Sequence, residues 1–164
     1  MIVVIMGVSG AGKTTVGKLL AEQLDAAFLE GDAFHPPGNI AKMQAGEPLD
    51  DDDRRPWLES MARELARCEA SDQSVVLACS ALKRRYRDIL RAGCPGVTFV
   101  YLSGTKELIR RRITSRSGHF MPPALLDSQF AALEAPSADE AIVVDVGETP
   151  DAIAARAAER LKGD

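Results

Sequence analysis

Aromatic residues, cysteines and long apolar runs are all scarce in this chain of 164 residues. Aromatics make up 5% of it, so the small aliphatic residues must build most of the core. The three cysteines (Cys68, Cys79 and Cys94) include no CxxC pair, so nothing suggests a disulfide framework or a zinc site, and a reducing cytoplasm is the simplest location. The apolar opening "MIVVIM" is short for a signal peptide, and no run approaches the roughly 20 residues of a membrane helix.

An excess of positive charge is missing as well. The net charge is −4 and the pI is about 5.3, which argues against nucleic acid or an anionic membrane as the main partner. The length suits one domain, and we expect residues 1–164 to form it.

Short apolar segments alternate with helical patterns along the whole chain. The opening segment is followed by four others, at 26–30, 74–79, 97–102 and 141–146, each typical of a strand buried on both faces. Helices are expected between them and after the last. This order predicts an α/β fold of three layers, a five-stranded parallel sheet with helices on both faces. Ligands of such sheets bind beyond the carboxyl ends of the strands.

A phosphate-binding loop follows the first expected strand. "GVSGAGKT" matches GxxxxGK[ST] in full, between a strand and a helical pattern. Its glycines let successive backbone N–H groups point at phosphate oxygens, and the helix that follows adds a positive dipole. Lys13 is predicted to bridge the β- and γ-phosphates of ATP, and the Thr14 hydroxyl to bind Mg²⁺. The expected nucleotide-binding residues are Gly7, Val8, Ser9, Gly10, Ala11, Gly12, Lys13, Thr14 and Thr15.

The loop alone does not name a function. Switch GTPases share it, but their DxxG and NKxD segments do not occur here, and the chain is short for a motor. A small kinase fits better. An enzyme of this kind needs a group near the acceptor hydroxyl to take its proton.

Asp32 is the candidate for that role. It follows the second strand, which in the usual layouts of such sheets lies beside the strand that feeds the phosphate loop. It could orient or deprotonate the acceptor, or hold Mg²⁺ through water; the alternative is an Asp that only caps a turn. The third strand ends in "LACSAL" without an acid, which increases the demand on Asp32.

Four strings make the sequence resemble the bacterial gluconate kinase (gluconokinase) family. They are "GVSGAGKTT", "EGDAFHPPGNIAKMQAGEPLDDDDRRPWL", "CSALKRRYRD" and "RSGHFMP". The second and third are far more specific than the phosphate loop, and the resemblance runs from residue 1 to about 146. It implies transfer of the ATP γ-phosphate to the 6-hydroxyl of D-gluconate. It also implies an adenylate-kinase-like P-loop kinase fold with a small lid, and commonly a homodimer.

Gluconate is a polyol with one carboxylate, so its site needs hydrogen-bonding groups and a cation, for which the planar arginine fork is well suited. Arg54 follows four aspartates, a run that could equally be a solvated helix cap. Lys83 and Arg87 are four apart and would share a helical face, where they could also be surface residues. His35 could donate to a hydroxyl or cap its own turn. The expected substrate-binding residues are Asp32, His35, Arg54, Lys83, Arg87 and His119, the last because it fits the family string.

A basic helix end runs into a glycine-containing loop at "RITSRSGHFMPP" and predicts a lid at about 112–124. Arg112 would contact the nucleotide, and Arg116 would stabilise charge on the transferring phosphoryl group while the lid excludes water. A basic solvent-exposed face is the alternative. At the level of function, the alternatives are another small-molecule kinase, of the shikimate or adenylylsulfate type, and a non-catalytic nucleotide-binding regulator.

Overall fold

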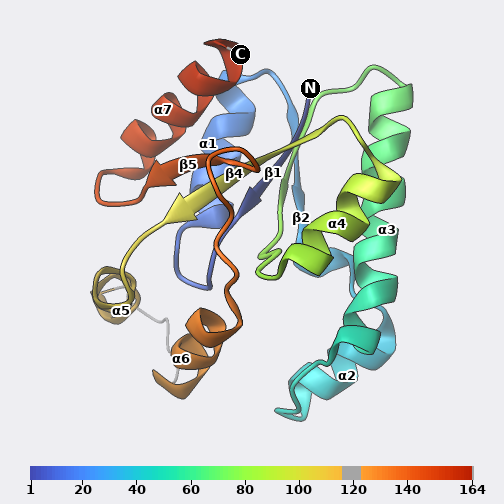
Figure 1. Ribbon diagram of the computed structural model, residues 1–164, viewed down its shortest axis with the longest axis vertical. Helices are drawn as coiled ribbons and strands as arrows, with labels where there is room; N and C mark the ends of the chain where they lie inside the picture. The colour runs from blue at the N-terminus through green and yellow to red at the C-terminus, as the bar shows by residue number, and fades with distance from the viewer. Residues whose placement is uncertain (116–122, 164) are drawn as a thin grey trace.

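The computed structural model describes residues 1–115 and 123–163 (Figure 1). The strands are β1 (Ile2–Met6), β2 (Ala27–Glu30), β3 (Val75–Ala78), β4 (Val97–Ser103) and β5 (Ile142–Asp145). The helices are α1 (Lys13–Gln23), the 3₁₀ turn η1 (Gly31–Phe34), α2 (Pro37–Gln44), α3 (Asp51–Ala70), α4 (Arg84–Gly93), α5 (Lys106–Ser115), α6 (Pro123–Ala132) and α7 (Pro150–Gly163). All five expected strands are present, and the predicted fold class is confirmed.

The strands form one parallel sheet in the order β2-β3-β1-β4-β5. The expectation that the second strand lies beside the first is wrong, because β3 is inserted between them. The sheet register still brings their ends level: Glu30 of β2 and Ile5 of β1 both pair with Ala78 of β3. Residues that follow β2 therefore lie at the same edge of the sheet as the loop that follows β1.

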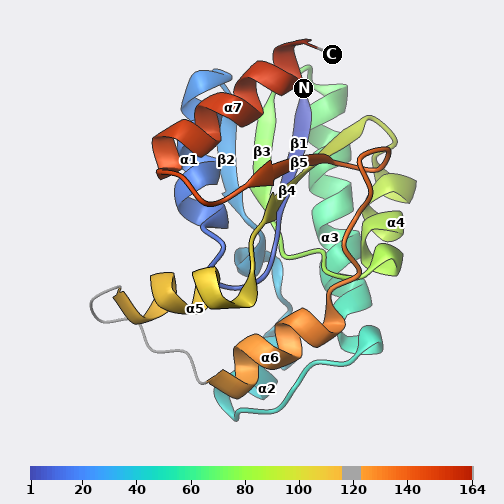
Figure 2. The ribbon, with the colours of Figure 1, turned by 60° about the vertical axis from the view of Figure 1, so that its left-hand side comes forward.

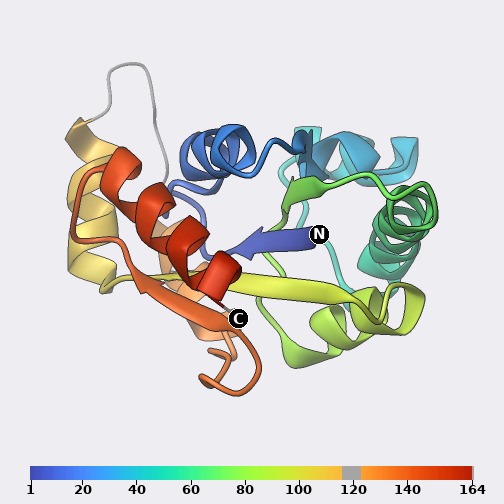
Figure 3. The same cartoon turned by 90° about the horizontal axis from the view of Figure 1, so that it is seen from above.

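The sheet separates two apolar clusters because its side chains alternate between the faces. Val3, Ile5 and Val100 belong to the cluster that includes side chains of α1 and α7. Val4, Leu77 and Phe99 belong to the cluster under α3 and α4. Seen from above, the helices flank the sheet on both sides, as a three-layer fold requires (Figure 3).

The carboxyl ends of the strands carry the remaining helices. α2, α5 and α6 lie at that end of the molecule, and both chain termini lie at the opposite end (Figures 1 and 2). No helix within the described ranges is both long and apolar enough to cross a membrane. Of the predicted lid at 112–124, residues 116–122 lie outside the described part of the chain, so the lid stays a prediction.

Candidate active site

The loop between β1 and α1 adopts the backbone that its glycines allow. Gly10 and Gly12 have φ values of 85° and 98°, in the region that L side chains rarely adopt, and Gly12 is the N-cap of α1. A Cβ on Gly10 would also come within 2.6 Å of the Ile113 side chain on α5. The loop is thus enclosed by α5 on one side and ends at the positive pole of α1.

The Lys13 side chain lies back across the loop that precedes it. Its Nζ donates to the carbonyl oxygens of Gly7 and Val8, each at 3.0 Å. Burial lowers the pKa of Lys13, and the negative charges of Asp32 and Glu30 are among the influences that oppose this shift. Both carboxylates at the end of β2 therefore act electrostatically on the lysine that is predicted to hold the phosphates.

Glu30 is a residue of this site that the motif analysis missed. The Thr14 hydroxyl donates to Glu30 Oε2 at 2.7 Å, so a carboxylate lies against the hydroxyl predicted to bind Mg²⁺. Hydroxyl and carboxylate oxygens are the ligands that Mg²⁺ prefers, and the pair fits such an ion. The sequence offers one indication of its role, because Glu30 ends its strand only two residues before Asp32.

A second contact joins the loop to α6. The backbone N–H and the hydroxyl of Ser9 both point at Gln129 Oε1, at 3.2 and 3.3 Å. One amide of the phosphate loop thus has a side-chain partner from a helix 120 residues further along the chain. No motif surrounds Gln129, so the sequence offers little signal for this contact.

A cavity of about 320 Å³ lies against the loop. It is lined by Gly10, Ala11, Gly12, Thr15, Arg112, Glu148 and Pro150. Arg112 reaches it from α5 and donates to the Glu148 carbonyl at 2.9 Å. The predicted nucleotide-binding residues from the loop and from α5 therefore meet around one cavity beside the phosphate cradle.

Asp32 lies in η1, directly after β2, with an exposed side chain. His35 follows, and its ring stacks on Trp57 of α3 with the centroids 4.3 Å apart. The Trp57 indole donates to the Gly31 carbonyl at 2.8 Å, which ties this turn to α3. Burial lowers the pKa of His35, Asp32 opposes the shift and Arg54 adds to it, so both charged groups act on the imidazole. The Nδ1 atom of His35 lies 3.1 Å from Asn39 Nδ2.

Arg54 and Lys83 converge on Tyr86, although they come from different elements. Arg54, in the first turn of α3, donates to the Tyr86 hydroxyl at 3.1 Å. Lys83 is the N-cap residue of α4, with its ammonium 5.8 Å from the centroid of the Tyr86 ring. Because α4 begins after Lys83, this residue does not share a helical face with Arg87 in the way the spacing predicted.

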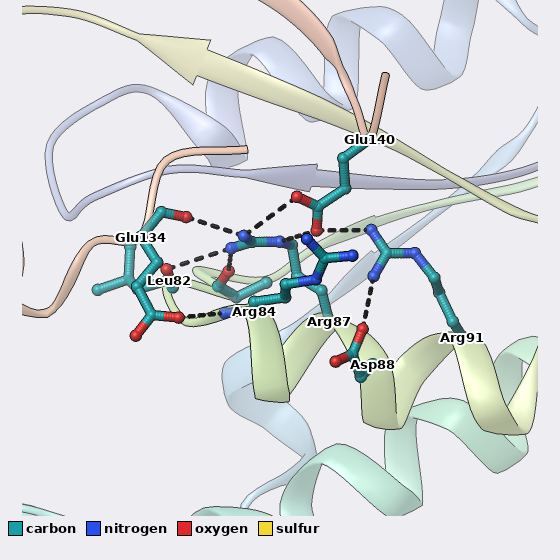
Figure 4. A network of polar contacts seen from close by, with 8 residues as sticks. Leu82, Arg84, Arg87, Asp88, Arg91, Glu134 and Glu140 are labelled. Atoms are coloured by element: carbon teal, nitrogen blue, oxygen red, sulfur yellow. Dashed lines mark hydrogen bonds and ion pairs between the residues drawn. The ribbon is translucent and has the colours of Figure 1, made fainter. Parts of the chain in front are cut away.

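The structure argues against a substrate-binding role for Arg87. Its side chain is 1% exposed and its guanidinium is fully engaged, with Glu140 Oε1 at 2.6 Å and the carbonyls of Ala81, Leu82 and Glu134 at 2.8–3.2 Å (Figure 4). Burial would raise the pKa of Glu140, but the hydrogen bonds from Arg87 and Arg91 outweigh it and hold this pKa below its usual value. Arg87 thus fastens the segment after α6 to the start of α4.

Two predicted site residues, Arg116 and His119, lie outside the described residues, and their roles stay predictions.

Where a P-loop protein would carry an acid after the third strand, this chain has Cys79, whose thiol is buried. Burial raises the pKa of this thiol to about 12, so it is neutral and does not replace the missing carboxylate.

Comparison with known proteins agrees with this geometry. A family model described as shikimate kinase matches residues 9–162. The thermoresistant gluconokinase of Escherichia coli (strain K12) is 44% identical over 98% of this chain and 93% of its own. A crystal structure of a gluconokinase from Sinorhizobium meliloti 1021 has a TM-score of 0.86 at 46% identity, covering 99% of this chain and 95% of that one. The shikimate kinase of Aquifex aeolicus, 17% identical with a TM-score of 0.66 over 99% and 97% of the two chains, shares the fold.

The fold and the phosphate loop thus define a small P-loop kinase of the shikimate kinase type. Within that class, identities above 40% over nearly the whole chain are decisive: the protein belongs to the gluconokinase family.

Proposed function

We propose that the protein transfers the γ-phosphoryl group of ATP to the 6-hydroxyl of D-gluconate, giving 6-phosphogluconate and ADP. Family membership supports the activity, and the row of polar groups that starts at Asp32 supports the substrate. Asp32 and Arg54 both act on His35, and Arg54 in turn meets Lys83 at Tyr86. A carboxylate at one end and cations at the other match a linear acceptor with a reactive hydroxyl at one end and an acid at the other.

The chain's own groups have separable roles. The loop from Gly7 to Thr15 binds the phosphates, with Lys13 leaving the Gly7 and Val8 carbonyls to contact them. Asp32 orients the 6-hydroxyl and accepts its proton, while Arg54 and Lys83 hold the carboxylate. Thr14 and Asp32, with Glu30 beside the Thr14 hydroxyl, would hold Mg²⁺, which when bound offsets negative charge on the phosphates. Arg112 borders the nucleotide cavity, and Arg116 and His119 are assigned to the lid on family resemblance alone.

The cellular location and the oligomeric state are proposals as well. We place the enzyme in the cytoplasm, which suits its three free and buried thiols, and infer a homodimer from the family resemblance.

A coupled assay that detects ADP tests the substrate. With ATP and Mg²⁺, we expect turnover on D-gluconate and far less on other sugar acids, shikimate or adenylylsulfate. Turnover on shikimate without turnover on gluconate would contradict the proposal. Tight ATP binding without turnover on any acceptor would instead indicate a nucleotide-binding regulator.

A further inference from the structure

The Tyr86 hydroxyl sits where the N-terminal ends of α3 and α4 meet. It donates to Asp51 Oδ1 at 2.6 Å and accepts from Arg54 at 3.1 Å. The side chain is 5% exposed, so its position is set by the core beneath it, where it packs in the cluster under α3 and α4. A rigid phenol with both of its hydrogen-bonding roles filled is a fixed point between two helices.

Two cations are gathered around this ring. The Arg54 guanidinium carbon lies 5.5 Å from the ring centroid and the Lys83 ammonium 5.8 Å from it, both within reach of the negative π face. Lys83 also lies 3.7 Å from the Asp51 carboxylate that accepts from Tyr86. Both cations therefore lie near the same ring, and the ring and the Asp51 carboxylate offset part of their positive charge.

The cations remain able to take a ligand. Within the described part of the chain, the Arg54 guanidinium makes one hydrogen bond, to Tyr86, which leaves four N–H donors. The Lys83 side chain is 27% exposed. His35 stacks on Trp57, which lies on α3 three residues after Arg54, and both Arg54 and Asp32 influence the pKa of His35. The pair of cations thus lies within electrostatic reach of the turn that carries Asp32.

We propose that Tyr86, held by Asp51, is a positioning residue that fixes Arg54 and Lys83 as a two-cation receptor for the carboxylate of the acceptor. This inference rests on the proposed function, which assigns the carboxylate to Arg54 and Lys83, and deepens it, because it identifies what holds these two cations in place. Tyr86 itself touches neither the substrate nor the nucleotide. It determines specificity for an acid over a neutral polyol by preventing the cations from relaxing into solvent.

Tyr86→Phe tests this, because it keeps the ring and removes only the hydroxyl. Loss of a hydrogen bond to a charged group predicts a KM for gluconate about 10-fold higher. The kcat and the KM for ATP should change less than the KM for gluconate. D-Sorbitol, which carries a hydroxymethyl group in place of the carboxylate, is the matched neutral ligand, and its inhibition constant as a competitor should be unchanged. Tyr101→Phe, at the chain's other tyrosine, is the control for hydroxyl removal and should leave the KM for gluconate unchanged.

The possible failures are distinguishable. If the unaltered enzyme does not phosphorylate gluconate, the proposed function falls and this inference falls with it. If it does, and Tyr86→Phe keeps a normal KM for gluconate, only the inference is overturned. Equal weakening of gluconate and sorbitol would also overturn it, since Tyr86 would then shape the whole acceptor site rather than its acid end. Thermal unfolding of each variant shows whether a changed KM reflects lost folding.

Discussion

The hydroxyl of Thr14, in the first turn of α1, donates a hydrogen bond of 2.7 Å to the carboxylate of Glu30 at the end of β2. Thr14 lies in the helix that follows β1, and Glu30 ends β2; these two strands are not neighbours, since β3 lies between them. The contact forms because the parallel register brings the strand ends level. It joins the phosphate loop to the turn that carries Asp32.

Glu30→Gln should therefore weaken the use of Mg²⁺. The variant keeps the size of the side chain but removes the negative charge beside the Thr14 hydroxyl. We expect the Mg²⁺ concentration for half-maximal rate to rise roughly 10-fold or more, the range found when groups that support a metal ligand are lost. Titration of the rate with Mg²⁺ at fixed ATP measures this. Glu22→Gln, on the exposed part of α1, is the matched control, and equal Mg²⁺ curves for both variants would rule the role out.

Arg87→Met should destabilise the fold rather than impair substrate binding specifically. The substitution leaves Glu140 without its buried partner and removes the Arg87 donor from the Ala81 and Glu134 carbonyls, whereas the Leu82 carbonyl still accepts from the Glu134 N–H (Figure 4). Breaking a buried ion pair in this way costs about 3–5 kcal/mol of the free energy of unfolding. Denaturant unfolding measures the loss, and Arg84→Ala, an exposed position on the same helix, should stay within about 0.5 kcal/mol of the unaltered protein.

A double variant shows whether the lost stability comes from the unpaired charge of Glu140 or from a disturbance of α4 itself. Replacing both Arg87 and Glu140 by apolar residues should recover much of the lost stability, because no unpaired charge stays buried. If Arg87→Met is as stable as Arg84→Ala, the structural role assigned to Arg87 is wrong.

We expect protonation of His35 to lower the stability of the folded protein in mild acid. Burial lowers its pKa below the ordinary value of 6.5, so as the pH falls through that value the unfolded chain binds the proton first. The free energy of unfolding therefore falls until the pH passes below the folded-state pKa. His35→Phe can still stack on Trp57 but cannot be protonated. We expect the melting temperature of the unaltered protein to fall more between pH 7.5 and 5.5 than that of the variant, and parallel falls would contradict the assignment.

Much of the fold could be predicted because it depends on patterns among residues that are close in the sequence. The five apolar segments and the phosphate loop each depend on residues close in sequence, and strand-helix alternation implies a parallel sheet. Strand order is not local, so the insertion of β3 could not be foreseen. The structural role of Arg87 could not be predicted either, because its partner Glu140 is 53 residues away in the sequence. Only the folded path of the segment after α6 brings the two side chains together. Glu30 was hidden because one acid at a strand end carries no motif.

Asp32 is the residue on which the proposed transfer depends most, because it is the group assigned to the acceptor hydroxyl. Asp32→Asn preserves shape and removes the base, and Asp25→Asn, in the turn before β2, is the control. The direct measurement is the kcat with saturating ATP and gluconate, beside ATP affinity by binding titration. We predict that Asp32→Asn lowers kcat roughly 10²–10⁴-fold with ATP affinity little changed, while Asp25→Asn keeps both. An Asp32→Asn enzyme that turns over gluconate at the unaltered rate would contradict the proposed chemistry.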